Sequence, residues 1–315
     1  MEFISADTVY QCLTYGQLTD GLLRLHREEP AALQDMLLGE GRSGPDNFIL
    51  IRAAFQSGKA VGVKMATVFP GNQSLPAVQA AFVIFDGRNG APLGMIDGTA
   101  LTHRKTAADS ALGSKLLSRE DSKSLLMVGA GGMSPHLIRA HLAVRPKLQT
   151  VRLWNRTAAR AHAVVELLDH EGITVEVADD LAESVATSDI ICCATMSNTP
   201  IIKGEWLQPG SHLDLVGAYR IDMREADDEC LRKSHLFVDS RKTTIGEIGE
   251  IDIPLKAGVI TEQSIIADYY DLANPEFAWR RAGTDITVLK NGGGGHLDLM
   301  TARLIFEQAL PGVLP

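Results

Sequence analysis

A short apolar run that ends in closely spaced glycines constrains the fold of this chain more than any other stretch. Residues 125–128 are apolar and predict a short buried strand, and the residues after them have the spacing of a dinucleotide-binding turn. The first glycine permits a tight turn, the second lets the backbone approach a pyrophosphate, and the small third residue lets the next helix pack against the strand. The residues expected to contact a dinucleotide here are Gly129, Gly131, Gly132, Met133 and Ser134.

A helix is predicted directly after this turn. Pro135 suits the first turn of a helix, where its missing N–H costs nothing, and the free N–H groups of a helix start hold phosphate. Glycines punctuate many turns, so a bare turn between strand and helix without a ligand is the alternative. The regular alternation of strands and helices further along the chain favours a ligand site.

A second strand, residues 150–155, bears on the choice of cofactor. It ends in Asn155 and Arg156, where an Asp or Glu would normally bind the ribose hydroxyls. Asn155 can bond a hydroxyl, and Arg156 can meet a 2′-phosphate. The sequence therefore predicts a nicotinamide dinucleotide, with NADP slightly favoured over NAD.

The middle of the chain predicts an α/β fold with a Rossmann-type, doubly wound parallel sheet. Helices are expected at 157–170, capped by Thr157, at 180–186 and from about 222, between strands at 173–177, 189–195, 211–216 and 236–239. The carboxyl ends of such strands share one edge, where ligands bind. That edge would present Gly129, Asn155, Thr195 and Gly217.

A run of four glycines near the end of the chain separates a strand at 285–290 from a helix at 297–310. Ordering four glycines costs much conformational entropy. Either the run is a linker, or it allows the backbone to approach a ligand closely, at the nicotinamide end. The second interpretation makes Asn291 and Gly292 candidate cofactor contacts.

The first part of the chain predicts a separate unit. Amphipathic helices broken near Pro30 are expected within residues 1–38, followed by antiparallel strands at 48–55, 60–69, 77–85 and 92–96 and a helix at 100–117. The residues 56–59 between the first two strands predict a hairpin-like turn.

Composition narrows the possible partners. The net charge is −9, which argues against nucleic acid and anionic membranes, so an anionic substrate would need a local positive site. No signal peptide and no apolar run of membrane-spanning length is visible. Four cysteines without metal-type spacing predict reduced core thiols, and with them a cytoplasmic protein.

Three basic residues are the candidates for that positive site. Lys64 lies inside an apolar strand, where it either protects a sheet edge or projects into a cleft. Arg104 and Lys105 open the predicted helix at 100–117, where two cations oppose the helix dipole unless an anion offsets them; a solvated basic face is the alternative. His103 is either an acid–base group or, as we expect, a structural residue. His296 either caps the glycine turn or touches substrate, and no metal cluster is predicted.

Several segments, in order, resemble the ornithine cyclodeaminase/mu-crystallin family. They are residues 62–72, 101–108, 129–131, 194–195 with Pro200, and 204–210. The resemblance covers about residues 48–310 and implies a Rossmann domain (116–291) and a second α/β domain for substrate binding and dimerisation, built from both chain ends (1–115 with 292–315). It implies that Lys64 contacts substrate and that an Arg at the position of Lys105 grips its carboxylate. In this sequence, the resemblance implies that Lys105 or Arg104 binds the substrate carboxylate. Another family Arg has no secure match, and Arg42 is a poor candidate.

The largest departure from the cyclodeaminases is Tyr219, which stands where they carry an Asp that engages the terminal amine of the substrate. The surrounding residues are similar to the pyrroline-2-carboxylate reductase branch. The resemblance therefore implies a homodimeric NAD(P)H-dependent reductase of a cyclic ketimine such as 1-pyrroline-2-carboxylate, a small anionic imino acid, with Lys64, Arg104, Lys105 and Tyr219 at the substrate. The alternatives are an ornithine cyclodeaminase and a crystallin-like protein that binds NADPH without turnover.

Overall fold

The chain forms two compact units in a computed structural model that describes residues 2–39, 47–69, 71–279 and 282–314. Unit 1 comprises Met1–Thr106 with Gly294–Pro315, and unit 2 comprises Ala107–Gly293. The division falls between Thr106 and Ala107, inside one long helix, α3 (Gly98–Leu117), and the boundary predicted from the sequence, 115/116, lies in the same helix. Among the described residues, no helix is long and apolar enough to cross a membrane.

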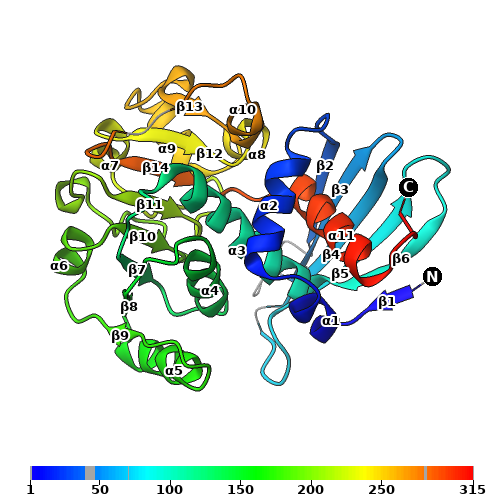
Figure 1. Ribbon diagram of the computed structural model, residues 1–315, viewed down its shortest axis with the longest axis horizontal. Helices are drawn as coiled ribbons and strands as arrows, with labels where there is room; N and C mark the ends of the chain where they lie inside the picture. Colours follow the sequence, from blue (N-terminus) through cyan, green and yellow to red (C-terminus); the bar gives the residue numbers. More distant parts are fainter. Residues whose placement is uncertain (1, 40–46, 70, 280–281, 315) are drawn as a thin grey trace. The chain divides into compact units, whose positions relative to one another are not determined.

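Unit 1 is a six-stranded sheet with helices from both ends of its chain (Figure 1). The strand order is β1-β6-β5-β4-β3-β2, antiparallel except for β1 against β6. Its elements are β1 (Glu2–Ile4), α1 (Ala6–Gln11), α2 (Tyr15–Leu25), β2 (Ala32–Gly39), β3 (Phe48–Gln56), β4 (Ala60–Val68), β5 (Val78–Asp86), β6 (Pro92–Asp97) and α11 (Gly295–Ala309).

Alternation along β4 decides which side chains meet the core of unit 1. Gly62, Lys64 and Ala66 point to the buried face, where α11 packs, and Val63 and Met65 point to the opposite face. A Cβ at Gly62 would lie 2.3 Å from Phe82 Cζ and 3.0 Å from Leu299 Cδ1 of α11, so the glycine leaves room for the Phe82 ring and for the helix. The strand therefore carries Lys64 into the interior of unit 1.

Two of the sequence expectations for unit 1 were wrong. Residues 31–37 were expected to be helical, but β2 pairs with β3 from Ala32 to Gly39. Pairing along a whole neighbouring strand outweighs the helical preference of its Ala, Leu and Met residues. The three residues of β1, which pair with β6, were also missed because so short a strand has no periodic signal.

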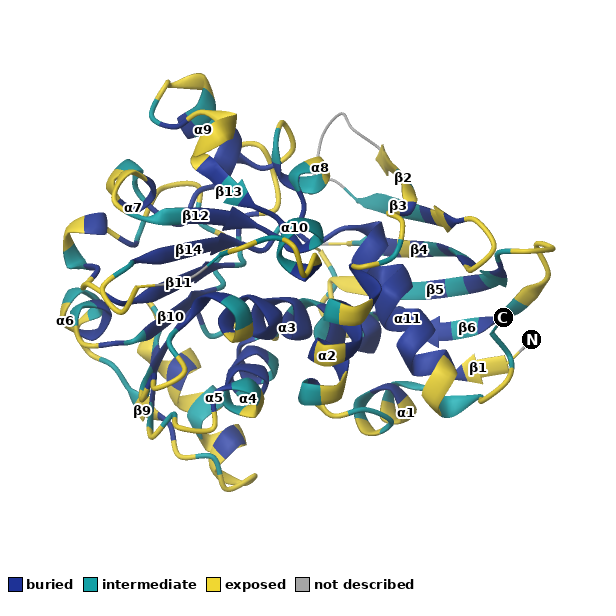
Figure 2. Cartoon of the chain, turned by 45° about the horizontal axis from the view of Figure 1, so that its top comes forward, coloured by how far each residue is buried: buried dark blue, intermediate teal, exposed yellow. Residues whose placement is uncertain are grey.

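Unit 2 is a doubly wound sheet of eight parallel strands in the order β13-β12-β14-β11-β10-β7-β8-β9, which confirms the predicted α/β class. The central strands β10, β11 and β14 are buried throughout, as Figure 2 shows in dark blue, whereas β8 and β9 are partly accessible. The elements of unit 2 are β7 (Ser124–Val128), α4 (Ser134–Val144), β8 (Thr150–Trp154), α5 (Ala158–Asp169), β9 (Glu176–Val177), α6 (Leu181–Ala186), β10 (Ile190–Cys193), η1 (Gly204–Trp206), β11 (His212–Leu215), α7 (Asp228–Arg232), β12 (His235–Val238), α8 (Arg241–Thr244), α9 (Gly249–Lys256), η2 (Glu262–Ser264), β13 (Ile265–Ala267), α10 (Tyr269–Ala273) and β14 (Thr287–Lys290).

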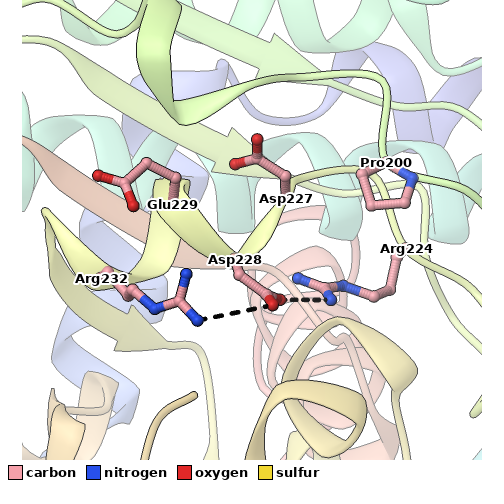
Figure 3. Close-up of a pocket in the computed structure, with 6 residues that line it drawn as sticks. All are labelled: Pro200, Arg224, Asp227, Asp228, Glu229 and Arg232. Atoms are coloured by element: carbon pink, nitrogen blue, oxygen red, sulfur yellow. Dashed lines mark hydrogen bonds and ion pairs between the residues drawn. The ribbon is translucent and has the colours of Figure 1, made fainter. Parts of the chain in front are cut away.

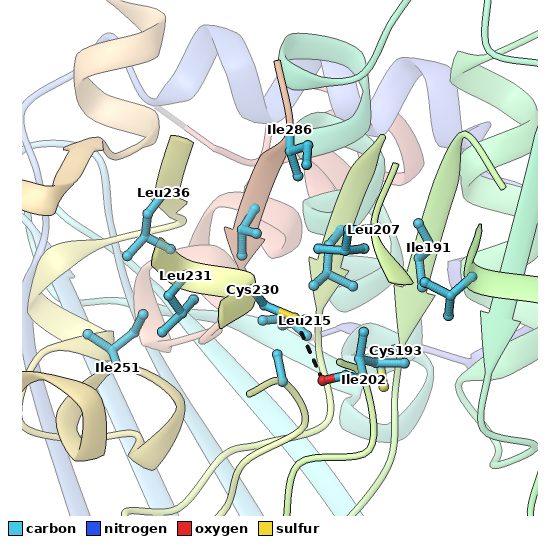
Figure 4. Packing of buried hydrophobic residues seen from close by; sticks show 14 of the residues in the cluster. Ile191, Cys193, Ile202, Leu207, Leu215, Cys230, Leu231, Leu236, Ile251 and Ile286 are labelled. Atoms are coloured by element: carbon cyan, nitrogen blue, oxygen red, sulfur yellow. Dashed lines mark hydrogen bonds between the residues drawn. The ribbon is translucent and has the colours of Figure 1, made fainter. Parts of the chain in front are cut away.

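The core of unit 2 explains why the sequences of its strands are continuously apolar. Side chains from β10, β11, β12 and β14 pack with those of the covering segments, including Ile191, Leu215 and Ile251 (Figure 4). Strands buried on both faces lose the polar alternation of half-exposed ones. All four cysteines are free thiols, three of them buried.

The helix predicted from about Asp222 begins later, as α7 at Asp228. The preceding residues form a loop in which the Glu225 carbonyl accepts hydrogen bonds from Ile201 N at 2.8 Å and Ile202 N at 2.9 Å. Pairing with that distant segment replaces the bonds a helix would use.

Candidate functional site

The first group of predicted residues lies in unit 1, around a buried ion pair. Lys64 Nζ donates to Asp298 Oδ1 at 2.8 Å and lies 2.7 Å from Oδ2. Lys64 is on β4 and Asp298 is in the first turn of α11, and both side chains are buried. Because β4 pairs with β3 on one side and β5 on the other, Lys64 does not protect a sheet edge, which excludes that alternative.

More positive than negative charge surrounds this pair. Burial acts to raise the pKa of the Asp298 carboxyl, but the charges of Lys64, Lys105 and Arg52 outweigh it and lower this pKa below its usual value. Burial lowers the pKa of Lys64 to about 8, against the attraction of Asp298, and the repulsion of Lys105 and Arg52 adds to the lowering. Arg52 is itself paired with Asp35 at 3.0 Å. Lys64 and Lys105 therefore share the single carboxylate of Asp298, and the excess of positive charge suits an anionic ligand.

Arg104 has different partners from Lys105. One of its guanidinium nitrogens donates to the Leu13 carbonyl, and the guanidinium carbon lies 4.0 Å from the centre of the Tyr15 ring. These contacts hold α3 against the turn between α1 and α2. The structure thus groups Lys105 with Lys64, while Arg104 is engaged elsewhere.

The helix-dipole argument for Arg104 and Lys105 was wrong. The helix begins at Gly98, and Asp97 accepts a hydrogen bond from Ala100 N at 2.8 Å. The two cations therefore lie beyond the first turn, where the dipole no longer acts strongly. Burial of Lys105, and not its place on the helix, makes it costly without an anion.

The histidines of unit 1 have packing contacts. His103 Nδ1 lies 2.8 Å from the Tyr10 hydroxyl, as expected of a structural residue. His296, at the start of α11, is buried with its ring edge against His26, and burial lowers its pKa well below the usual range. It is therefore neutral. Arg42 lies outside the described residues.

Sequence reasoning missed two members of the group. Arg52 is the cross-strand partner of Lys64, and the turn at 56–59 would have given that register. Asp298 lies 234 positions from Lys64. Its only local signal is that a single acid interrupts an otherwise apolar helix start.

The second group of predicted residues lies in unit 2, at the carboxyl ends of its strands. Gly129 follows β7 with φ +108°, and a Cβ there would lie 2.6 Å from the Ala194 carbonyl oxygen. A Cβ at Gly131 would meet nothing within 4 Å, and both Gly131 and Gly132 are exposed. The turn after β7 is therefore fixed at its base and open where a pyrophosphate would lie.

The start of α4 closes this turn. Ser134 Oγ donates to the Gly129 carbonyl at 2.6 Å, and Ser134 is fully buried at the first helical position. Met133 is the residue before the helix and bonds no helix N–H through its side chain. Ser134 N donates to the Gly131 carbonyl at 3.0 Å, and Pro135 has no N–H, so α4 offers a phosphate chiefly the positive end of its helix dipole.

Asn155 uses both ends of its amide within the protein. Its Oδ1 accepts from Ala130 N at 3.1 Å, and its Nδ2 donates to the Thr157 carbonyl at 2.9 Å. It therefore joins the turn after β7 to the loop after β8. Arg156 is exposed beside it, and Thr157 precedes α5 without the side-chain cap bond that was expected.

Three neighbouring strand ends contribute the other expected cofactor contacts. Thr195 follows β10, Gly217 follows β11, and Asn291 follows β14, where its Nδ2 donates to Ser110 Oγ at 2.9 Å. A Cβ at Gly292 would lie 2.6 Å from Thr244 Cγ2. Close packing within unit 2 therefore favours a residue without a Cβ at position 292.

Tyr219, the fourth residue expected at the substrate, lies in the loop after β11. Its side chain is 52% exposed, and its ring centre lies 5.9 Å from the Arg220 guanidinium carbon. Tyr219 provides a neutral hydroxyl and an accessible ring, and no carboxylate.

Unit 2 also contains a hollow and a buried polar cluster, and neither includes the residues described above. A hollow of about 350 Å³ is lined by charged residues of the segment around α7 (Figure 3), where Asp228 pairs with Arg224 at 2.8 Å and Arg232 at 3.9 Å. Three acidic and two basic residues line it, so it does not suit an anion.

Among the described residues, His141, Cys192 and Asp214 also come together in the core. Burial raises the pKa of Cys192, so its thiol keeps its proton and donates to Asp214 at 3.2 Å. His141 Nε2 lies 3.4 Å from the same carboxylate. These contacts account for the geometry of the cluster.

The chain is similar to known proteins along most of its length. Residues 41–312 match the description of the ornithine cyclodeaminase/mu-crystallin family. A Delta(1)-pyrroline-2-carboxylate reductase from Paracoccus denitrificans is 41% identical over 96% of both chains, and the ketimine reductase mu-crystallin of Mus musculus is 32% identical over 82% of this chain and 80% of its own. The structure of a Thermococcus litoralis Delta(1)-pyrroline-2-carboxylate reductase in complex with NADH and L-proline is similar at a TM-score of 0.90, with 30% identity, covering 100% of this chain and 99% of that one.

Proposed function

The chain belongs to the ornithine cyclodeaminase/mu-crystallin family, and on that premise we propose that it reduces cyclic ketimines such as 1-pyrroline-2-carboxylate with NAD(P)H. The names of its relatives support this reaction. The reaction adds a hydride to the imine carbon and a proton to the nitrogen, giving the cyclic amino acid and NAD(P)⁺. When bound, the reduced nicotinamide supplies the hydride.

The excess of positive charge around Lys64 is the observation that carries this proposal. A protein of net charge −9 has buried Lys64 and Lys105 beside a single paired carboxylate. Uncompensated buried charge is expensive unless a ligand of opposite sign neutralises it. We assign the substrate carboxylate to Lys64 and Lys105, and Arg104 to holding α3 against Leu13 and Tyr15.

Lys64 also suits the proton-transfer step. Its pKa of about 8 lies close to neutral pH, which favours general acid catalysis. The ammonium of Lys64 gives a proton to the reduced nitrogen and regains it from water. Asp298 keeps Nζ in place through both of its oxygens.

The cofactor is assigned to the strand ends of unit 2. The turn at Gly129–Ser134 receives the pyrophosphate, and Thr195, Gly217, Asn291 and Gly292 line the path toward the nicotinamide. We propose a preference for NADP because no acid follows β8 to repel a 2′-phosphate. Arg156 and Arg160 are both exposed at the start of α5.

Tyr219 distinguishes the reductase from the cyclodeaminase. Ornithine carries a second ammonium, which needs an anionic partner in a closed site. The cyclodeaminases of the family have an Asp at this position, and Tyr219 gives only a hydroxyl. A cyclic ketimine has no second amine, so its reduction does not need a carboxylate at the position of Tyr219.

We also propose that the protein is a homodimer. The face of the unit 1 sheet opposite α11 carries a cross-strand row of Met36, Ile51, Met65 and Ala81. Met36 is 47% and Met65 37% exposed. Large exposed apolar surfaces mark protein interfaces. A cytoplasmic location accords with the four free thiols.

One assay separates the candidate functions. Purified protein is given NADPH or NADH with five- and six-membered cyclic ketimine carboxylates, and loss of reduced cofactor is followed; ammonia release from ornithine with NAD⁺ is measured in parallel. We expect ketimine reduction and little ammonia. Faster conversion of ornithine to proline and ammonia would establish a cyclodeaminase, and cofactor binding without any turnover would establish a binding protein.

A further inference from the structure

A buried carboxylate joins two of the loops at the ligand-binding edge of unit 2. Glu225 is completely inaccessible. Its Oε1 accepts hydrogen bonds from Thr195 N at 2.7 Å and Thr195 Oγ1 at 2.8 Å. Its Oε2 accepts from Gly217 N at 2.6 Å and Ala218 N at 3.3 Å. These four donors come from two loops, those that follow β10 and β11, and the Cys193 thiol at the end of β10 also hydrogen-bonds the carboxylate.

These loops touch each other at the point where Glu225 joins them. A Cβ at Gly217 would lie 1.8 Å from the Thr195 carbonyl oxygen, so Gly217 must be glycine for the loops to approach this closely. The carboxylate bonds the N–H groups of both loops at this point. The last backbone bond between β10 and β11, from Val216 N to the Cys193 carbonyl, measures 2.8 Å, and beyond it the Glu225 carboxylate continues to join Thr195 and Gly217.

Glu225 is itself held from the opposite side by a second buried carboxylate. Glu250, in the first turn of α9, accepts from Glu225 N at 2.6 Å and from Ala226 N at 3.1 Å. The Glu225 carbonyl is fixed by Ile201 N and Ile202 N. Backbone and side chain of Glu225 are thus both fixed before any ligand binds.

Burying two adjacent carboxylates in a protein core has a high free-energy cost. Burial raises the pKa of Glu225, and burial with the charge of Glu225 raises the pKa of Glu250 to about 7, while Lys290 opposes both shifts. Apolar side chains would fill the same space at lower cost. The bonds made by Glu225 instead fix the loops at the strand ends.

We propose that Glu225 is a positioning residue of the cofactor site, which sets the loops of Thr195 and Gly217 for the nicotinamide half of the dinucleotide, with Glu250 as its anchor. This inference rests on the proposed function of unit 2 as the cofactor-binding unit. Glu225 contacts neither cofactor nor substrate and acts through the two loops. Its loss should therefore weaken cofactor binding more than imine binding.

The test is Glu225→Gln. The amide keeps the size of the side chain but has a single acceptor oxygen, and its NH₂ group opposes two of the four N–H and O–H donors. We expect the Kd for NADPH, measured by fluorescence titration without imine, to rise about tenfold. The KM for NADPH should rise in step, and the KM for the imine should change less than about twofold.

The matched control is Glu229→Gln, which changes an exposed carboxylate in the same segment and should leave both constants unchanged. Circular dichroism and thermal unfolding establish that each variant is folded. If Glu225→Gln does not fold, Glu250→Gln removes one acceptor from the anchor of Glu225 and changes neither of the two loops. It should raise the Kd for NADPH about threefold.

The outcomes separate this inference from the proposed function. Wild type that binds NADPH, with an unchanged Kd in the folded variants, overturns the positioning role alone. Equal increases in both KM values also overturn it, because they indicate a general structural defect. Wild type that binds no nicotinamide dinucleotide overturns the proposed function and this inference with it. Wild type that binds NADPH but reduces no imine, with a weakened Gln variant, supports the inference alone.

Discussion

Lys64 Nζ lies within 2.8 Å of both carboxylate oxygens of Asp298, and the two side chains are buried together in unit 1. Burial and attraction act in opposite directions on the lysine. Burial favours neutral Lys64 and lowers its pKa to about 8, and the Asp298 charge keeps the pKa from falling further. Asp298 thereby keeps Lys64 protonated at neutral pH.

This relationship predicts how Asp298→Asn changes the pH profile of imine reduction. In wild type, Lys64 is charged below about pH 8, so kcat/KM for the imine should be constant there and fall as pH rises through that value. Without the carboxylate, the ammonium loses its stabilising partner. The alkaline limb should then move to lower pH by about one unit.

Steady-state kinetics at a series of pH values measure this shift. The imine also titrates, but equally for every variant, so the difference between wild type and Asp298→Asn isolates the protein. The control is Asp7→Asn, an exposed carboxylate in unit 1, which should leave the profile in place. An alkaline limb that stays in place in folded Asp298→Asn would show that Lys64 does not control it.

Local sequence signals were enough to find the turn at Gly129 and the parallel sheet around it. A short apolar run, two glycines and a small residue each have a local physical meaning, and they are adjacent in the chain. The same holds for Lys64, because a charge inside an apolar strand is visible by itself. Neighbouring residues in the chain are therefore sufficient to identify both features.

Asp298 and Glu225 could not be found in this way. Asp298 acquires its role only when α11 returns from the end of the chain to cover β4, and Glu225 only when its loop pairs with residues 201–202. The error at Ala32–Gly39 has the same origin, because β2 is a strand by virtue of pairing with β3. Pairings between distant segments leave no periodicity in the segment itself.

The two glycines of the turn after β7 predict opposite effects of substitution. Gly131→Val should fold normally, since a Cβ there meets nothing within 4 Å, yet it should abolish measurable NADPH binding because it occupies the pyrophosphate position. Gly129→Ala should lower the free energy of unfolding by about 2 kcal/mol, because φ is +108°. Urea unfolding and fluorescence titration separate the two effects, and tight NADPH binding by folded Gly131→Val would contradict the assignment of this turn.

The substitution Arg156→Ala tests whether Arg156 recognises the 2′-phosphate that distinguishes NADPH from NADH. Only NADPH carries a 2′-phosphate, so its Kd should rise about tenfold while that of NADH changes less than about twofold. Lys147→Ala, an exposed cation between α4 and β8, is the matched control for general loss of positive charge. Equal losses for both cofactors would mean that Arg156 does not recognise the phosphate.

The substitution Val63→Lys tests whether this face of the unit 1 sheet forms the proposed dimer. Val63 lies on the face of β4 opposite Lys64, beside Ala53 and Val83 on the neighbouring strands, and its half-buried side chain leaves room for a longer one in a single copy. In a twofold symmetric dimer the substitution places two unpaired charges in one interface. The dimer dissociation constant, from sedimentation equilibrium, should rise at least about a hundredfold. Ser57→Lys, in the exposed turn before β4, should leave it unchanged. Monomeric wild type at micromolar concentration would contradict the proposed dimer.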